Sequence, residues 1–405
     1  MKTHAALRSI VVTGLVLALV SGCSLFGDGP KWGAKRDAEK AAKVVPALPE
    51  PVPTHLFEID DTTDIVGVVQ KTRASKEDTL TDIARRFNVG YEEIVRANPG
   101  VDPWLPGDRE IVIPSQFILP NAPRQGIVIN AAAMRLFYYP KVKKGEQQVV
   151  HTYPIGIGKV GWKTPEGATT IVRRTKDPVW RPTASILAEH KKNDDPLPAV
   201  VPAGPDNPLG RFAFYLGWPT YMIHGTNKPA GVGLRSSHGC IRLYPEDILQ
   251  LFELAPIGTS VRVVNQPFVF GWHSGALHIQ AFDVLEDDPR DWKKAQAKLL
   301  NKALAERIQQ ELKARKEKID WEAVSRLSHE PRGIPVSVSG GPDQLDAIVA
   351  NATVVQNKVA PGATWDGISD LPVDEETFQE LVSDRESSVE SAAAAAAPAP
   401  KPVAN

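Results

Sequence analysis

The sequence predicts a mainly β central domain with a β-sandwich or barrel-like fold, preceded by a small β-α-α-β unit and followed by a helical extension. Three observations lead to this prediction. Residues 124–265 hold many short β-rich runs and a single clear helix pattern. Residues 64–114 place two short amphipathic helix patterns between two β runs. Residues 266–330 contain a long stretch rich in Ala, Leu, Lys, Glu and Gln, which are strong helix formers.

The composition of the chain is that of an ordinary globular protein. Its 405 residues are enough for two or three domains, and 42% of them are hydrophobic and 23% charged. The formal net charge is -1. Nucleic-acid-binding proteins usually carry a strong basic excess, so no nucleic-acid partner is expected.

The first 22 residues have the pattern of a signal peptide. Lys2 and Arg8 precede an apolar run over residues 10–20, which is too short to span a bilayer. The run ends in "LVSGCS", which resembles the bacterial lipobox, whose Cys becomes the lipidated first residue of the mature chain. Cys23 is therefore the predicted lipidation site, and Ser24 in place of Asp favours delivery to the outer membrane. The expected location is the periplasm, with a lipid anchor; a plain secretory signal with an incidental Cys is the alternative.

Residues 23–63 are rich in Lys, Ala, Pro and Glu without periodicity, which predicts a flexible tether. If Cys23 is acylated, Cys240 has no disulfide partner, because the chain has only two cysteines. An unpaired thiol in an exported protein is a liability unless it is buried or used.

The β-α-α-β pattern over residues 64–114 is specific. Its first helix has an apolar face with i, i+3, i+4, i+7 spacing and an N-cap at Asp78 or Thr79, and its second begins near Tyr91 and ends before "NPG". The runs "VGVVQ" and "EIVIP" flank the helices. The order resembles a LysM module through "EDTL", "IARRF", "EEIVRANPGV", "LPG" and "IVIP", with Glu77 standing where the common pattern has Gly. The resemblance implies binding to glycan that contains N-acetylglucosamine; a packing domain without a ligand is the alternative.

The central domain carries its chemistry in "HGTNKPAGVGLRSSHGCIRL", residues 224–243. Such a run of Gly and small residues predicts a loop, and a fold that closes the loop brings His224 near Cys240. An imidazole that takes the proton of a thiol makes it a nucleophile. Zinc ligation is the first alternative, but the run lacks a fourth ligand and the usual short ligand pairs. Burial of inert core residues is the second. A helix is expected after the loop, from Pro245, with Glu246 at its positive end.

These residues resemble the signature of the L,D-transpeptidase (YkuD-like) catalytic family. The chain supplies His224-Gly225-Thr226 and then Ser237-His238-Gly239-Cys240-Ile241-Arg242. The likeness extends through "VINAAAMRLFYYP", "TYPIGIGKVGWKTPEGATTIVRRTKDPVWRPT" and "VVPAGPDNPLGRFAFYLG", so it covers residues 124–265. It implies a β-sandwich-like domain that remodels the stem peptides of peptidoglycan without a metal or an organic cofactor.

The resemblance also implies roles for single residues. Cys240 matches the nucleophile that attacks the carbonyl before the terminal D-Ala of a tetrapeptide stem, and His224 matches its general base, oriented by the Gly225 carbonyl. Backbone N–H groups at Gly239 and Cys240 are the expected oxyanion donors, and His238 is expected to support the turn or line the pocket.

Four residues of the run are candidates for substrate binding. Arg242, and more weakly Arg235, are expected from their charge to pair with a stem-peptide carboxylate. Ser237 and Thr226 complete the set. The Pro-rich stretch over residues 186–207 is the candidate for a loop over the groove, and His190 within it is expected to face solvent or pack.

Three functions stay open at this point. The first is acyl transfer to an amine, which gives a 3-3 cross-link or attaches an abundant outer-membrane lipoprotein through its C-terminal Lys. The second is hydrolysis at the same site, and the third is a non-catalytic lipoprotein that binds the wall through the LysM module. If the module only targets the enzyme, a chain of residues 124–405 should keep its chemistry and lose affinity for intact sacculi.

Beyond residue 265 the sequence predicts three segments. Residues 266–330 form an extension with a long charged helix from about residue 289 to 327. Residues 331–380 form a small α/β element, and residues 381–405 a disordered tail.

Overall fold

A computed structural model describes residues 48–76, 78–143, 145–291, 313–314, 318–339 and 344–358. The signal peptide, Cys23, Glu77 and the tail lie outside these residues, so their assignments stay predictions. Among the described residues, no helix is both long and apolar enough to cross a membrane.

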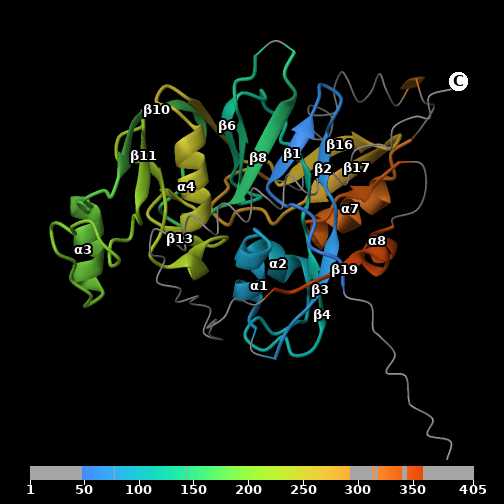
Figure 1. Cartoon of the computed structure of the whole chain (residues 1–405), viewed down its shortest axis with the longest axis horizontal. Coiled ribbons are helices and arrows are strands. Elements are labelled where there is room, and N and C mark those ends of the chain that lie inside the picture. The colour runs from blue at the N-terminus through green and yellow to red at the C-terminus, as the bar shows by residue number, and fades with distance from the viewer. Residues whose placement is uncertain are drawn as a thin grey trace, which may run out of the picture. The chain divides into compact units, whose positions relative to one another are not determined.

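A nine-stranded sheet forms the central domain, in the order β1-β8-β7-β6-β15-β10-β11-β12-β14 (Figure 1). Its strands are β1 (Leu56–Ile59), β6 (Gly126–Asn130), β7 (Arg135–Tyr139), β8 (Gln148–Pro154), β10 (Gly167–Lys176), β11 (Phe212–Leu216), β12 (Met222–His224), β14 (Ile241–Arg242) and β15 (Ser260–Val264). Two pairs are parallel, β6 with β15 and β12 with β14. A separate short pair joins β9 (Ile157–Gly158) to β13 (Arg235–Ser237). The mainly β prediction is confirmed.

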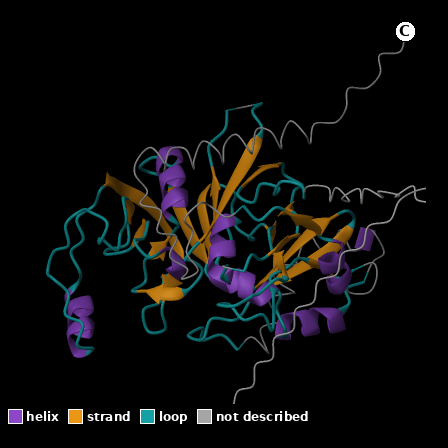
Figure 2. Cartoon of the chain, turned by 60° about the horizontal axis from the view of Figure 1, so that its bottom comes forward, coloured by secondary structure: helices purple, strands orange, loops and turns teal. Residues whose placement is uncertain are grey.

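Two α-helices accompany this sheet. Helix α4 (Pro245–Leu254) begins at Pro245 as predicted and buries Ile248, Leu251 and Phe252 in the main core, against β11. Helix α3 (Ala184–Lys192) was not predicted. It lies in the Pro-rich stretch expected to be a loop, the Thr183 hydroxyl caps it, and Ile186 is its one buried residue. Figures 1 and 2 show α3 at the end of long loops, apart from α4.

The predicted β-α-α-β unit is present as β3 (Gln70–Arg73), α1 (Leu80–Arg86), α2 (Tyr91–Ala97) and β4 (Glu110–Ile113); residues 70–113 are called the βααβ unit below. Thr79 is the N-cap of α1, because its hydroxyl accepts from the Asp82 N–H while the Asp82 carboxylate accepts from the Thr79 N–H. Helix α2 ends at Asn98, at the predicted "NPG".

Two predicted boundaries in the N-terminal part are wrong. The tether does not extend to residue 63, because β1 pairs antiparallel with β8 at the edge of the main sheet. The "VGVVQ" run is not one strand: β2 (Ile65–Gly67) pairs with β5 (Gln116–Ile118), whereas β3 pairs with β4. Gly67 ends β2 with a φ of 75°, and this break divides the run.

The C-terminal extension also differs from the prediction. Strands β16 (Phe268–His273), β17 (Ala276–Ala281) and β18 (Val336–Ser337) form a sheet whose core includes residues of α7 (Trp321–His329). Asp320 caps the start of α7 and Ile319 forms a β-bridge, so no continuous helix reaches residue 327. The rest of that predicted helix falls mostly outside the described residues.

The predicted separate α/β element over residues 331–380 is not found in its described part. Strand β18 completes the sheet of the extension, and after α8 (Leu345–Asn351) strand β19 (Thr353–Val355) pairs parallel with β3. Residues far along the chain thus supply the third strand of the βααβ unit.

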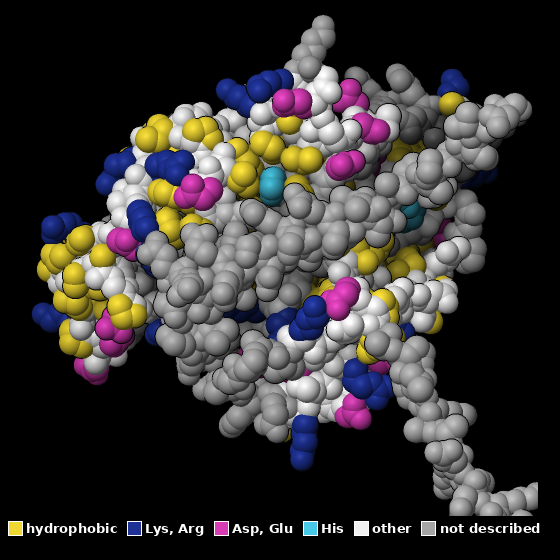
Figure 3. Space-filling view, in the orientation of Figure 1, with side chains coloured by type: hydrophobic (Ala, Val, Ile, Leu, Met, Phe, Trp, Pro, Cys, Tyr) yellow, Lys and Arg dark blue, Asp and Glu magenta, His cyan; other side chains and the backbone are white. Residues whose placement is uncertain are grey.

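On the face in Figure 3, Lys and Arg alternate with Asp and Glu over the described surface.

Candidate active site

Parallel strands β12 and β14 bring the two signature segments together. Their register pairs Ile223 with Ile241 and His224 with Arg242. Side chains alternate between the two faces of a strand, so His224 and Arg242 project from the same face. Cys240 directly precedes β14, and the charge of Arg242 acts on both the His224 imidazole and the Cys240 thiol. The strand pairing therefore brings the imidazole and the guanidinium together, with the thiol next to the start of β14.

A tight turn orients Cys240. Gly239 has a φ of 99°, and a Cβ at this position would lie 2.8 Å from the ring of Tyr221. The Ser237 hydroxyl accepts from the Gly239 N–H at 3.1 Å and donates to the Cys240 carbonyl at 2.5 Å. The Gly239 N–H already bonds to Ser237, so its role as an oxyanion donor stays a prediction without support from this contact. The Cys240 N–H stays the candidate.

His224 is a neutral imidazole with one defined tautomer. Its Nδ1 donates to the Gly225 carbonyl at 2.6 Å, as the sequence analysis expects, which leaves the lone pair on Nε2. Only 3% of its surface is exposed. Burial, reinforced by the positive charge of Arg242, lowers the pKa of His224 to about 3, against smaller opposing effects of backbone hydrogen bonds with Gly225 and Leu209. At neutral pH the resting imidazole is therefore uncharged and only weakly basic.

Cys240 is held as a neutral thiol. Its Sγ lies 3.6 Å from the Thr220 carbonyl oxygen. Burial raises the pKa of the Cys240 thiol to about 11, against smaller opposing effects of a Met222 backbone hydrogen bond and of Arg242. The resting pair is therefore thiol and imidazole rather than thiolate and imidazolium.

This protonation state predicts an unusual alkylation profile for Cys240. In a Cys23→Ala chain, where it is the single thiol, iodoacetamide should react about tenfold faster for each pH unit up to about pH 11, because the rate follows the thiolate fraction. The same chain unfolded in urea is the control, and its rate should level off at the ordinary thiol pKa of about 8.5. A plateau below pH 8 in the folded protein would mean that a preformed ion pair exists.

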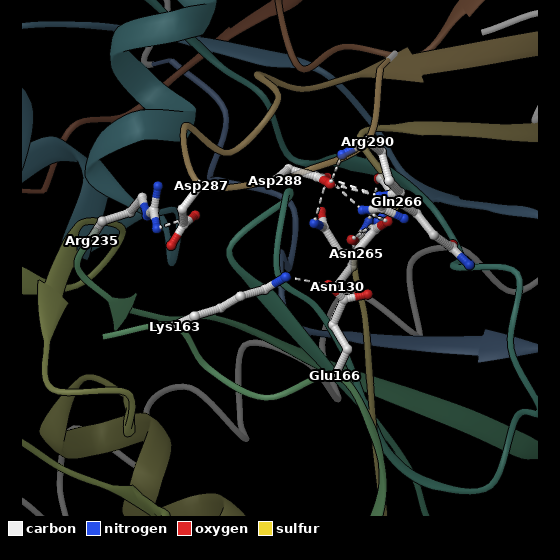
Figure 4. A network of polar contacts seen from close by, with 9 residues as sticks. All are labelled: Asn130, Lys163, Glu166, Arg235, Asn265, Gln266, Asp287, Asp288 and Arg290. Atoms are coloured by element: carbon white, nitrogen blue, oxygen red, sulfur yellow. Dashed lines mark hydrogen bonds and ion pairs between the residues drawn. The ribbon is translucent and has the colours of Figure 1, made fainter. Parts of the chain in front are cut away.

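Arg242 and Arg235 have different surroundings. Arg242 donates to the Ser236 hydroxyl at 3.3 Å, while its buried Nε has no hydrogen-bond partner among the described residues. Arg242 therefore keeps donor capacity for a ligand. Arg235 instead pairs with Asp287 at 2.7 Å and donates to the Gly158 carbonyl at 3.3 Å. Figure 4 shows Arg235 pointing at Asp287, but its Nη1 is also without a hydrogen-bond partner among the described residues, so its role in substrate binding stays a prediction.

Thr226 and Ser237 also shape the loop instead of facing a ligand. Both are buried. The Thr226 hydroxyl accepts from the Lys228 N–H at 2.9 Å, and Ser237 makes the two bonds of the Cys240 turn. Their predicted role in substrate binding has no support in these contacts.

His238 connects the turn to helix α3. Its Nε2 lies 3.3 Å from Glu189 of α3, and its ring stands edge-on to Trp162 at 4.7 Å between centroids. Glu189 also contacts the Lys159 ammonium. His190, expected to face solvent or pack, lies with its ring 5.9 Å from that of His238. The supporting role predicted for His238 thus has partners that the sequence analysis missed.

Over the ranges that the structure describes, no three His, Cys, Asp or Glu side chains gather in a way that could hold an ion.

The comparisons with known proteins agree on one family. A model of the L,D-transpeptidase catalytic domain (YkuD) matches residues 124–263, and a LysM domain model matches residues 74–113. The probable L,D-transpeptidase YbiS of Escherichia coli K12 is 47% identical over 225 residues, which are 55% of this chain and 70% of that protein. The probable L,D-transpeptidase ErfK/SrfK of Salmonella typhimurium is 48% identical over 193 residues, 47% of this chain and 61% of that one.

Solved structures of the same family are more distant. An L,D-transpeptidase from Mycobacterium smegmatis is 20% identical, with a TM-score of 0.27, over 35% of this chain and 58% of that one. The catalytic domain of the E. faecium L,D-transpeptidase is 22% identical, with a TM-score of 0.26, over 36% of this chain and all (100%) of that one.

The strands and the loop that hold His224 and Cys240 lie within the matched catalytic domain. The E. coli relative is matched over more than two thirds of its length at nearly half identity. This chain therefore belongs to the L,D-transpeptidase family.

Proposed function

We propose that this protein is a periplasmic enzyme that transfers acyl groups between peptidoglycan stem peptides, with Cys240 as nucleophile and His224 as general base. The observation that carries the proposal is the β12–β14 pairing, which sets a neutral imidazole beside a guanidinium, with the thiol of Cys240 directly before β14. A merely wall-binding protein has no need for this arrangement, or for the hydrogen bond that fixes the His224 tautomer.

The first half-reaction forms a thioester. The Cys240 sulfur attacks the carbonyl before the terminal D-Ala while its proton passes to Nε2 of His224. The Cys240 N–H stabilises the oxyanion of the tetrahedral intermediate. When the C–N bond breaks, the imidazolium returns the proton to the leaving amine, so that D-Ala departs and the acyl group stays on sulfur.

The second half-reaction reverses these steps. An acceptor amine attacks the thioester carbonyl and gives a proton to His224, and the C–S bond breaks as the thiol is restored. The product carries an amide in place of the one that was cleaved, so no net oxidation or reduction occurs and no cofactor is required.

The positive charge of Arg242 should favour binding of a substrate that carries a carboxylate. Its charge is one of the two causes that lower the pKa of His224. A carboxylate bound to the guanidinium would offset that charge and make proton transfer to His224 easier. We therefore assign the terminal D-Ala carboxylate, which lies next to the cleaved bond, to Arg242.

Two further features belong to the proposal. Cys23 would carry a lipid anchor in the outer membrane, and the LysM domain would bind glycan strands of the wall. The acceptor is either a second diaminopimelate, which gives a 3-3 cross-link, or the C-terminal Lys of an abundant lipoprotein. Hydrolysis by water at the same thioester is the alternative function.

Product analysis separates these functions. The purified chain without its first 23 residues would be incubated with tetrapeptide muropeptides and with sacculi, and the products identified by mass spectrometry. Cross-linked muropeptides together with free D-Ala are expected. Tripeptides and D-Ala without any cross-link or lipoprotein attachment would favour the hydrolase, and no D-Ala release at all would contradict catalysis.

A further inference from the structure

The βααβ unit makes backbone contacts with the loop that leads to Cys240, called here the glycine-rich loop (residues 225–240). The N–H groups of Tyr91 and Glu92, at the start of α2, donate to the carbonyls of Val232 and Gly233, each at 3.2 Å. A Cβ on Gly90 would lie 2.8 Å from the Gly233 Cα. The two backbones thus meet without room for a side chain.

The same unit also contacts the chain after Cys240. The Tyr244 hydroxyl donates to the Val89 carbonyl at 3.1 Å. At the start of α4, Glu246 accepts two bonds of 3.0 Å from Arg85, and Asp247 accepts from Asn88 at 3.3 Å. The turn between α1 and α2 therefore touches both ends of the segment from residue 232 to 247, and Cys240 lies in its middle.

A buried ion pair fixes this turn on the main sheet. Arg135, at the start of β7, donates to both carboxylate oxygens of Glu93 at 2.7 Å and to the Asn88 carbonyl at 3.1 Å. The exposed fractions of the two side chains are 1% and 6%. Glu93 also accepts from the Gly90 N–H at 2.6 Å. The catalytic domain thus sets the position of Gly90 through an ion pair that is buried and therefore little screened by water or salt.

The C-terminal extension holds the same loop from another direction. Asp287 pairs with Arg235, and the neighbouring Asp288 accepts from Asn265 at 2.9 Å and from Arg290 at 2.6 Å (Figure 4). The glycine-rich loop is therefore held in place by residues on both sides of the catalytic domain in the sequence.

We infer that the α1–α2 turn of the βααβ unit is a part of the active-site scaffold, with Gly90 as a positioning residue for Cys240. The inference rests on the proposed function for its effect on turnover, but the contacts themselves do not depend on it. A module that only tethers the enzyme to glycan would need no such fit to the loop. A module that positions Cys240 would need it, because a displacement of about 1 Å at a reacting group costs on the order of 100-fold in rate.

Gly90→Ala in the otherwise intact chain tests the inference. Gly90 has a φ of -85°, so Ala fits its backbone conformation, and the added methyl group meets Gly233. Gly100→Ala is the matched control: it lies in the same unit with a φ of 75° and open space around it, so it strains the unit without touching the loop. Amide hydrogen exchange of peptides over residues 225–240 and the kinetics of D-Ala release from a tetrapeptide muropeptide would be measured below the unfolding temperature.

Gly90→Ala is expected to raise the rate of amide exchange in the loop peptides by at least about tenfold and to lower kcat by at least about tenfold. KM should stay within about twofold of the parent chain. Gly100→Ala is expected to change neither. Loop exchange at the parent rate in Gly90→Ala, or faster exchange with an unchanged kcat, overturns the inference. If the parent chain releases no D-Ala, the proposed function fails, while the exchange rates still decide whether the turn holds the loop. If Gly90→Ala does not fold, Gly233→Ala makes the same contact from the loop side, with Gly258→Ala, also at positive φ in open space, as its control.

Discussion

Cys240→Ala should reduce D-Ala release from tetrapeptide muropeptides by at least about 1000-fold, because it removes the nucleophile that forms the thioester. It should also abolish acylation of the site by a carbapenem, because no thiol is left there to attack the carbonyl of the β-lactam ring. Release would be followed by coupled detection of D-Ala and acylation by intact mass. Cys240→Ser should be nearly as inactive, since a hydroxyl requires much stronger base assistance than a thiol. Residual turnover in Cys240→Ala close to the parent rate would remove Cys240 from the mechanism.

His224→Ala separates the base from the nucleophile. It should leave a slow rate that rises with pH beyond the ordinary thiol range, because Cys240 must then ionise by itself with a pKa of about 11. His278→Ala, which lies on β17 outside the site, is the control and should behave as the parent chain. A parent-like rate of His224→Ala at neutral pH would mean that the proton leaves by another group, with His238 as the nearest candidate in the sequence.

The second large effect concerns the βααβ unit, whose contacts with the catalytic domain favour a different outcome for residues 124–405 from the one that the sequence alone predicts. That truncation removes β1 from the edge of the main sheet. It also removes Ile59, Phe117 and Leu119, which share a buried core with Val128, Phe137 and Val150 of the catalytic domain. Uncovering such a core costs about 1.5–3 kcal/mol for each large apolar side chain, against the roughly 5–15 kcal/mol that stabilises a typical domain. The truncated chain should therefore be unfolded or inactive, and not merely unable to bind sacculi.

A single substitution tests the same point in the full chain. Glu93→Gln should lower the free energy of unfolding in urea by about 3 kcal/mol, because it leaves the Arg135 charge buried without its partner. Asp108→Asn is the matched control, since its pair with Arg73 in the same unit is exposed and should contribute less than about 1 kcal/mol. Equal midpoints of urea unfolding for the two variants, or an active 124–405 chain, would show that the interface contributes little to the stability of the protein.

The sequence was sufficient wherever a local pattern determines local structure. Thr79 and Asp82 form a capping box three residues apart, and Pro245 starts α4, so both helix starts could be predicted. The His-Gly and Ser-His-Gly-Cys segments gave His224 and Cys240 as candidates through their resemblance to the family signature, and the positive φ at 239 explains why glycine stands next to the thiol.

Most of the missed features depend on contacts between distant segments. Glu189 meets His238, Asp287 meets Arg235, and Glu93 meets Arg135, each separated by more than 40 residues. Strands β1 and β19 have four and three residues, too few for a periodic pattern, and their pairing partners decide their structure. The substrate roles predicted for Ser237 and Thr226 stay untested, and the hydroxyls of both residues bond to the backbone of the loop.

The most direct test of the mechanism is the intact mass of the protein during turnover. The Cys23→Ala chain would be mixed with a tetrapeptide muropeptide, quenched in acid within seconds, and digested to locate any adduct. The account predicts an acyl adduct equal to the donor minus D-Ala, on Cys240, formed together with an equivalent of free D-Ala and lost when an acceptor amine is added. Without an acceptor amine, the adduct should persist long enough to be detected. Release of D-Ala under these conditions, with no adduct on Cys240 at any time, would contradict the mechanism.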